Sequence, residues 1–198
     1  MKNHIKITSF LLALLLMFSA FPLAVSAETT NAQGTGQTGY ASDFEHMVYY
    51  SDHATITNYT GSADCLEIPY ELDGYTVTEI GSYAFDYNDN LTNVIFPASV
   101  DEIGYYAFEG CSKLAQVTMS DSVMWIGDHA FVDCPALKGV TLPQGVQSIA
   151  DHAFGYVYNE YGDPVKVKDF TITGYTYSAA ENYAINNGFK FVSIGAKP

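Results

Sequence analysis

Apolar residues recur along this chain with a period of 23 residues. The clearest marker is a six-residue cassette, in which Ile is followed by Gly, two variable residues, Ala and Phe. It occurs at residues 80–85, 103–108, 126–131 and, with Ala in place of Gly, 149–154. A fixed period of about 20 to 50 residues is typical of a solenoid, because each unit is too small to bury its own apolar face and must stack on a neighbour.

Four further apolar columns emerge when the repeats are aligned on this cassette. They are Leu91, Leu114 and Leu137; Val94, Val117 and Val140; Phe96, Met119 and Leu142; and Val100, Val123 and Val146. Together with the Ile, Ala and Phe of the cassette, they give each coil seven inward positions. A core therefore forms only when several coils stack between capped ends.

The same pattern predicts the elements of each coil. The segment from the Leu column to the Phe/Met/Leu column, as in Leu91 to Phe96, ends with apolar residues at alternate positions, which predicts a short strand. A second extended stretch joins the next Val column to Ile, as in Val100 to Ile103. A tight turn should follow, and we expect Gly81, Gly104 and Gly127 to open it with a positive φ. Parallel strands of successive coils lie about 4.8 Å apart, so equivalent side chains should form ladders. The sequence thus predicts a repeat solenoid that is mainly β.

The full repeat, I-G-x-x-A-F-x-x-C-x-x-L-x-x-V-x-x-P, is complete from Ile126 to Pro143. It resembles the BspA-type leucine-rich repeat of secreted and surface proteins, especially those of anaerobic bacteria. Residues 54–61 and 170–184 resemble the two caps of that family. The resemblance implies a right-handed leucine-rich repeat coil with 23-residue repeats, short strands, tight or 3-10 turns, and a C-terminal capping helix and strand. It implies no catalytic residue.

On this basis the repeat domain spans residues 42–198, with an N-terminal cap at 44–79, repeats at 80–172 and a C-terminal cap at 173–198. A loop insertion is expected at 155–164, because Phe154 lies 16 residues before Phe170 whereas Phe85 lies nine before Val94. This alignment gives an insertion of seven residues. Solenoids accommodate extra residues as a loop on one face, so the segment should project outward as a small hairpin.

Residues 1–27 have the pattern of a secretory signal peptide. Lys2 and Lys6 precede an apolar stretch at 10–18, and cleavage is expected after Ala27. Residues 28–41, rich in Thr, Gln and Gly, are predicted to be a disordered leader. The apolar stretch is too short to indicate a membrane span. We therefore expect no span after signal removal, and a chain that is secreted or associated with the cell surface.

Acidic residues outnumber basic residues by 22 to 8, and the sequence contains no Arg. Removal of the signal peptide takes away two Lys and leaves 6 basic against 22 acidic residues, a net charge of −16. Such a surface repels phosphate backbones, which excludes nucleic acid as a partner. The charge is best explained by solubility, with a dedicated cationic partner as the alternative. A monomer is expected.

Three Cys residues are present, an odd number for an exported protein. Cys111 and Cys134 share a column one coil apart, near the Cα separation that a disulfide allows. Parallel stacking, however, keeps their Cβ atoms beyond the usual range of about 3.5–4.5 Å. We interpret them as small buried thiols, and a disulfide between them is the alternative. Cys65 has no obvious partner.

His129 and His152 occupy matched positions, each after an Asp, so that two imidazoles could reach one transition-metal ion. The equivalent residues Tyr83 and Tyr106 indicate instead a slot on an outward turn that accepts any polar or aromatic residue. No metalloprotease, nucleophile-elbow or phosphate-loop motif is present. We therefore predict no metal, no cofactor and no catalytic residue. A metal-binding protein or metal-assisted enzyme that uses the His129/His152 ladder is the alternative.

Each coil exposes two residues between its second Val column and the Ile column. They are polar at 78–79, 101–102 and 147–148, but the third coil has Met124 and Trp125. An exposed Trp beside Met is typical of a binding hot spot, although the pair could instead pack against an adjacent loop. We predict a non-enzymatic module that binds a protein or a glycan, or serves adhesion, with Met124 and Trp125 in its binding site.

Overall fold

The computed structural model describes residues 37–38, 40–49 and 52–197, which belong to one compact unit. The predicted signal peptide at 1–27 lies outside the described residues, and so do residues 28–36 of the predicted leader. The described residues at and just after the end of that leader include two short elements. Gln37–Thr38 forms strand β1, and Ala41–Asp43 forms a 3-10 turn, η1.

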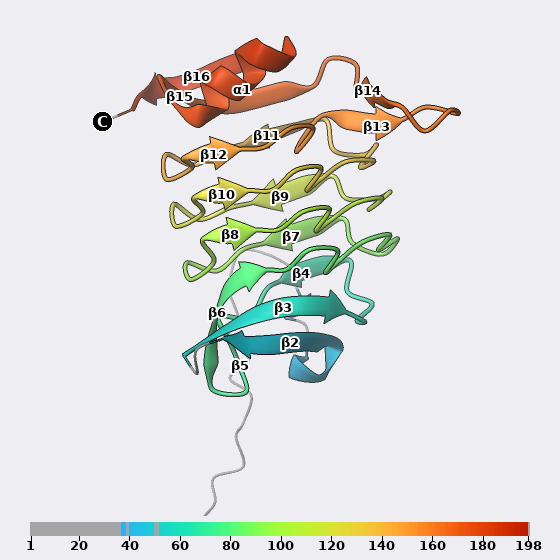
Figure 1. The fold of residues 1–198 in the computed structure, drawn as a ribbon, viewed down its shortest axis with the longest axis vertical. Helices are drawn as coiled ribbons and strands as arrows, with labels where there is room; N and C mark the ends of the chain where they lie inside the picture. The colour runs from blue at the N-terminus through green and yellow to red at the C-terminus, as the bar shows by residue number, and fades with distance from the viewer. Residues whose placement is uncertain (1–36, 39, 50–51, 198) are drawn as a thin grey trace, which may run out of the picture. The chain divides into compact units, whose positions relative to one another are not determined.

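Each coil of the solenoid contributes one strand to each of two faces (Figure 1). The first face carries two sheets. One contains, in order, β1, β4 (Cys65–Glu67), β7 (Asn93–Ile95) and β9 (Gln116–Thr118). The other contains β11 (Gly139–Thr141), β15 (Thr171–Thr176) and β16 (Lys190–Ala196). On the second face the order is β12 (Ser148–Ile149), β10 (Trp125–Ile126), β8 (Glu102–Ile103), β6 (Tyr75–Ile80), β3 (His53–Tyr59) and β2 (Phe44–Tyr49). The pairs between coils are parallel, whereas β2 and the short strand β5 (Glu71–Leu72) pair antiparallel to β3 and β6.

The strand register confirms the period and the ladders. Ile80 pairs with Ile103, and Ile103 pairs with Ile126, each 23 residues further along the chain. On the other face, Val94 pairs with Val117 over the same interval. The prediction of a mainly β solenoid built from 23-residue repeats is therefore correct.

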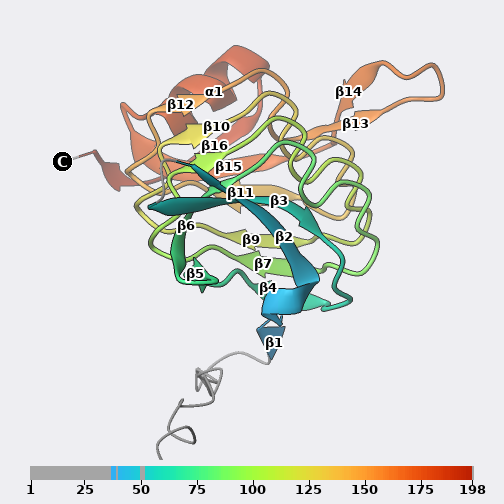
Figure 2. The same cartoon turned by 60° about the horizontal axis from the view of Figure 1, so that its bottom comes forward.

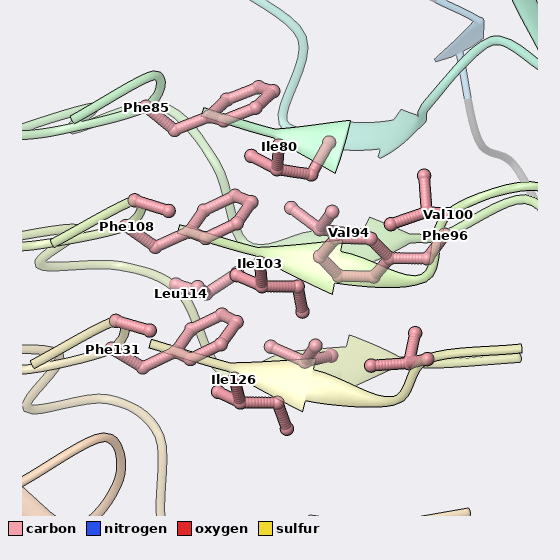
Figure 3. Packing of buried hydrophobic residues seen from close by; sticks show 14 of the residues in the cluster. Ile80, Phe85, Val94, Phe96, Val100, Ile103, Phe108, Leu114, Ile126 and Phe131 are labelled. Carbon is pink, nitrogen blue, oxygen red and sulfur yellow. The ribbon is translucent and has the colours of Figure 1, made fainter. Parts of the chain in front are cut away.

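The predicted apolar columns form the core between the two faces (Figure 3). Two members, Met119 and Ile149, are only partly buried. The Phe rings of successive cassettes stack with centroid separations of 4.6, 4.9 and 4.8 Å. These stacks run along the whole array of cassettes, so each coil completes the core of the one before it.

The prediction that the cassette glycines have positive φ was wrong. A Cβ at Gly104 would lie 2.7 Å from the backbone nitrogen of Ser82, and a Cβ at Gly127 would lie 2.7 Å from the carbonyl carbon of Gly104. Gly is required because the backbones of successive coils approach too closely for a side chain. The positive φ occurs two residues later, at Tyr83 (62°), Tyr106 (55°), His129 (56°) and His152 (53°).

The inserted segment forms an antiparallel hairpin of β13 (Tyr156–Tyr158) and β14 (Pro164–Lys166), which projects beyond the coils (Figure 2). The insertion contains nine residues rather than the seven predicted. Val140 pairs with Ile172, 32 residues further along instead of 23, so Ile172 and not Phe170 belongs to the Val column. Phe170 packs instead against Phe189, with ring centroids 5.4 Å apart.

Helix α1 (Ala179–Asn187) and β16 close the C-terminal end of the array. Ser178 caps the helix, because its hydroxyl accepts a hydrogen bond from the backbone N–H of Glu181. The buried hydroxyl of Tyr183 donates to the carbonyl oxygen of Phe154 at 2.8 Å and accepts from its N–H at 2.9 Å. One side chain of the cap thus satisfies both backbone groups of a residue in the last coil.

Because β10 is enclosed between β8 and β12, the Gly127→Ala variant cannot relieve its backbone clash by moving outward. We expect its free energy of unfolding to fall by about 1–3 kcal/mol, the usual cost of overpacking. Ala150→Gly is the matched control, since Ala150 occupies the same column beside β12, the last strand of its sheet, and should change stability by no more than about 1 kcal/mol. Urea denaturation measures both, and equal effects would contradict the close-approach explanation.

Tyr183→Phe leaves the backbone N–H and carbonyl of Phe154 without their partner in the cap. We expect it to lower the free energy of unfolding by about 1–3 kcal/mol, because these groups are buried. Tyr177→Phe is the control, since Tyr177 is 86% exposed, and should stay within about 0.5 kcal/mol of the parent. An unchanged denaturation midpoint for Tyr183→Phe would show that the cap is not held by this hydroxyl.

Candidate functional site

Trp125 lies on β10 in a row of side chains that crosses the second face. In the register of the sheet it stands between Glu102 on β8 and Ser148 on β12, and Glu79 on β6 extends the row beyond Glu102. We refer to these four residues as the Trp125 ladder. Trp125 is 43% exposed, so its indole lies on the surface of the sheet.

Met124, the other predicted binding residue, is half-buried beside the ladder. The side-chain amide of Gln147, in the next coil, donates a hydrogen bond of 3.3 Å to the Met124 sulfur. Met124 therefore supports the surface next to Trp125 and offers only part of its side chain to a partner. The predicted slot is thus exposed at Trp125 and only partly exposed at Met124.

The acidic half of the ladder contains two carboxylates in neighbouring strands. Partial burial raises the pKa of Glu102, and the charges of Glu79 and Asp101 raise it further. Glu79 is oriented by Thr55, whose hydroxyl donates a hydrogen bond of 2.9 Å to Glu79 Oε2. Like charges directly opposite each other destabilise a sheet, so a cationic group placed over Glu79 and Glu102 would be bound favourably.

A second ladder runs along the cassette turns, and we refer to it as the ring column. It consists of Tyr83, Tyr106, His129 and His152, whose successive ring centroids lie 5.2, 4.9 and 4.8 Å apart. These are the residues with left-handed backbone, which places each ring over the next. Tyr83 is exposed, but the two imidazoles are half-buried within the stack rather than extended into solvent, as an outward turn would have them.

The ring column brings His129 and His152 together, and Asp128 joins them. The candidate ligand atoms of these three residues all lie within 4.8 Å of one another. Asp128 Oδ1 and His129 Nδ1 are 2.9 Å apart, yet both atoms are shielded from solvent and neither makes a hydrogen bond. The carboxylate oxygen and the imidazole nitrogen thus lie within ion-pair distance of each other but lack the hydrogen bonds that buried polar atoms normally make.

A groove of about 480 Å³ lies on the first face at β9 and β11. Within the described part of the chain, neither strand pairing nor a backbone hydrogen bond links these two strands, and β11 pairs with β15 instead. The groove is lined by Thr118, Thr141 and Thr173, and also by Asp121. Sequence reasoning missed this groove. No pattern within a single coil signals it, because the partner of β11 is β15, which follows the inserted hairpin.

All three Cys residues are free thiols in the structure. Cys111 and Cys134 are buried, and their sulfurs donate to the carbonyl oxygens of Phe85 and Phe108, at 3.1 and 3.2 Å. A hydrogen bond with Cys111, followed by burial, raises the pKa of Cys134 well above its ordinary value. This thiol therefore stays protonated, and it is unsuited to act as a nucleophile or a metal ligand.

The chain belongs to the BspA-type leucine-rich repeat family. The family model described as "BspA type Leucine rich repeat region" matches residues 67–163 in 6 copies. The repeat register and the stacked Phe column account for this match in physical terms. The resemblance inferred from residues 126 to 143 is thereby confirmed.

Solved structures give the same result. A leucine-rich repeat protein from Bacteroides capillosus is 31% identical, with 59% of this chain and 93% of that chain covered and a TM-score of 0.51. The leucine-rich repeat protein TpLRR of T. pallidum is 22% identical over 80% of this chain and 83% of that chain, with a TM-score of 0.57, which shows likeness of fold. No curated protein matches the chain significantly. Among the described residues, no helix is both long and apolar enough to cross a membrane.

The three thiols should differ in reactivity towards a thiol reagent. In the native protein we expect the half-buried Cys65 to react and the buried Cys111 and Cys134 to stay protected, because reagents attack the accessible thiolate. Denatured, unreduced protein should titrate three thiols. A single thiol per denatured chain would instead show that Cys111 and Cys134 are joined.

Proposed function

We propose that this chain is an exported, non-enzymatic module for binding or adhesion, and that its partner docks on the Trp125 ladder. The observation that carries the proposal is the 43% exposure of Trp125 in the middle of a regular sheet whose other ladder positions are polar. Large aromatic side chains at the centre of a contact surface contribute a disproportionate share of binding energy. Such a residue offers little to a folded core when it is left exposed.

Membership of the leucine-rich repeat family supports a role in protein binding. A solenoid presents rows of side chains on a rigid surface, which suits it to recognition rather than to the convergent pocket that catalysis needs. A protein partner is favoured over a surface glycan, because Glu79 and Glu102 lie next to the indole. That arrangement fits a partner segment with an apolar side chain beside Lys or Arg.

The export part of the proposal rests on the N-terminal segment. Lys2 and Lys6, the apolar stretch and the small residues before position 28 form a signal peptide pattern. Free buried thiols and an acidic surface are compatible with a secreted or surface-associated chain. Sequencing the N-terminus of the protein recovered from culture medium and from cell envelopes tests export and retention separately.

Trp125→Ala should weaken partner binding by about 2 kcal/mol or more, as expected for a hot-spot residue. Its free energy of unfolding should stay within about 0.5 kcal/mol of the parent, because the indole is not part of the core. The partner is first captured from the native surroundings on immobilised protein, and its affinity for both forms is then measured by calorimetry.

Tyr105→Ala provides the matched control for this experiment. Tyr105 is an exposed aromatic residue on the neighbouring coil, outside the Trp125 ladder, and its removal should leave affinity unchanged. A large loss of stability in Trp125→Ala with unchanged affinity would place Trp125 in the core and refute the proposed site. Equal losses of affinity in both variants would show that the partner binds exposed aromatic residues nonspecifically.

A further inference from the structure

We propose that Asp128, His129 and His152 form a binding site for one late first-row divalent metal ion, such as Zn²⁺ or Ni²⁺, between two successive coils. One carboxylate oxygen and two imidazole nitrogens are the donor types that these ions prefer. Their candidate ligand atoms already lie within 4.8 Å of one another. The site is distinct from the Trp125 ladder, and it does not depend on the function proposed for that ladder.

The first argument is the unsatisfied pair of atoms at the centre of the cluster. Asp128 Oδ1 and His129 Nδ1 are 2.9 Å apart and shielded from solvent, but they are not aligned for a hydrogen bond with each other. Buried polar atoms are nearly always hydrogen-bonded, so a close Asp–His pair that makes no hydrogen bond leaves both atoms able to bind a further partner. A cation held by both lone pairs would satisfy the carboxylate and the imidazole at once.

The second argument is the orientation of His152. The other pairs of the ring column are nearly parallel, with interplanar angles of 2° and 13°, whereas the planes of His129 and His152 differ by 36°. In-plane lone pairs of parallel rings cannot converge, but those of tilted rings can. Tyr156 packs edge-on against His152, with centroids 4.5 Å apart and an angle of 80°, and supports this tilt.

The third argument concerns distance and charge. Ligand atoms about 2.1 Å from a tetrahedral ion are about 3.4 Å apart, so closing the site requires a movement of roughly 1–1.5 Å. His152 is only half-buried and can supply it by rotating its side chain. Asp151, the equivalent of Asp128 in the next coil, is exposed beside the cluster. No Lys lies in either cassette, so the local charge favours a cation.

Such an ion would join two cassettes that are otherwise connected through backbone hydrogen bonds and apolar packing. The backbone N–H of His129 already donates a hydrogen bond of 3.0 Å to the backbone carbonyl oxygen of Asp151, so the two turns are in register for a side-chain cross-link. Binding to the folded state alone raises stability in proportion to the logarithm of ion concentration. The metal would therefore cross-link and stabilise the last coils of the array, next to the inserted hairpin.

The test uses untagged, metal-free mature protein and titrates it with Zn²⁺ by calorimetry. We expect saturable binding of one ion per chain and a rise in the thermal midpoint at saturating Zn²⁺. Co²⁺ serves as a spectroscopic probe, because nitrogen ligation in a four-coordinate site gives visible absorption bands of characteristic energy and intensity. This measurement reports on the parent protein and needs no variant.

Two variants take their replacement residues from other coils of the same protein. His152→Tyr introduces the residue found at Tyr83 and Tyr106, and Asp128→Ser introduces the residue found at Ser82, so both should preserve the fold. Each should weaken Zn²⁺ binding by roughly tenfold or more, since removing a direct ligand costs at least as much as removing its supporting groups. Circular dichroism of the variants verifies that the solenoid is intact.

His53→Tyr is the matched control, because His53 and Asp52 form another adjacent pair, 2.7 Å apart, at the opposite end of the array. Zn²⁺ affinity should be unchanged in this variant. Three results would overturn the proposal: no saturable binding, several weak ions per chain that persist in His152→Tyr and Asp128→Ser, or a loss of binding in His53→Tyr. The second result would mean that surface carboxylates alone attract the ions.

Discussion

Close backbone contact between successive coils is the constraint on which the rest of this structure depends. Hydrogen bonds join each cassette turn to the next, as from Tyr106 N–H to Asp128 O and from Phe108 N–H to Ala130 O. This spacing leaves no room for a Cβ at Gly104. It also fixes the sequence period, because a slip of one residue would turn core side chains outward and polar side chains inward.

The same constraint explains why surface chemistry occurs in rows. A residue on one coil stands directly over its counterpart on the next, so Trp125 meets Glu102 and His129 meets His152. The outcome depends on the pair: Phe rings reinforce each other, whereas Glu79 and Glu102 oppose each other. A ladder of stacked rings thus stabilises the fold, whereas a ladder of like charges is stabilised by binding a group of opposite charge.

Much of this architecture could be predicted from the sequence, because burial imposes an apolar residue, and often the same one, at every equivalent position. The period, the seven inward columns and the stacked Phe rings follow directly from that requirement. The glycines could be recognised but not explained, since the sequence shows that Gly is needed without showing whether φ or space requires it. The insertion was misjudged because Phe170 is apolar and fits the Val column in sequence, while in space it packs against Phe189 of the cap.

Other features depend on what the following coil does, which a local pattern does not contain. The groove between β9 and β11 exists because β11 pairs with β15, and that choice is set by the chain after the hairpin. The pairing of His129 with His152 was foreseen, but the contribution of Asp128 and the tilt of the rings emerge only from side-chain packing.

The distribution of these sites over the repeat has a physical reason. Core positions are restricted to apolar residues, because each change is transmitted through the stack, whereas ladder positions at the surface accept a wider range of side chains. Trp125, the His pair and the groove all lie in the later coils, where the sequence departs most from the repeat at Ser120, Ala150 and the insertion. Departures from an otherwise strict repeat need a compensating gain, and the binding role proposed for this chain would supply one through contact with something other than the next coil.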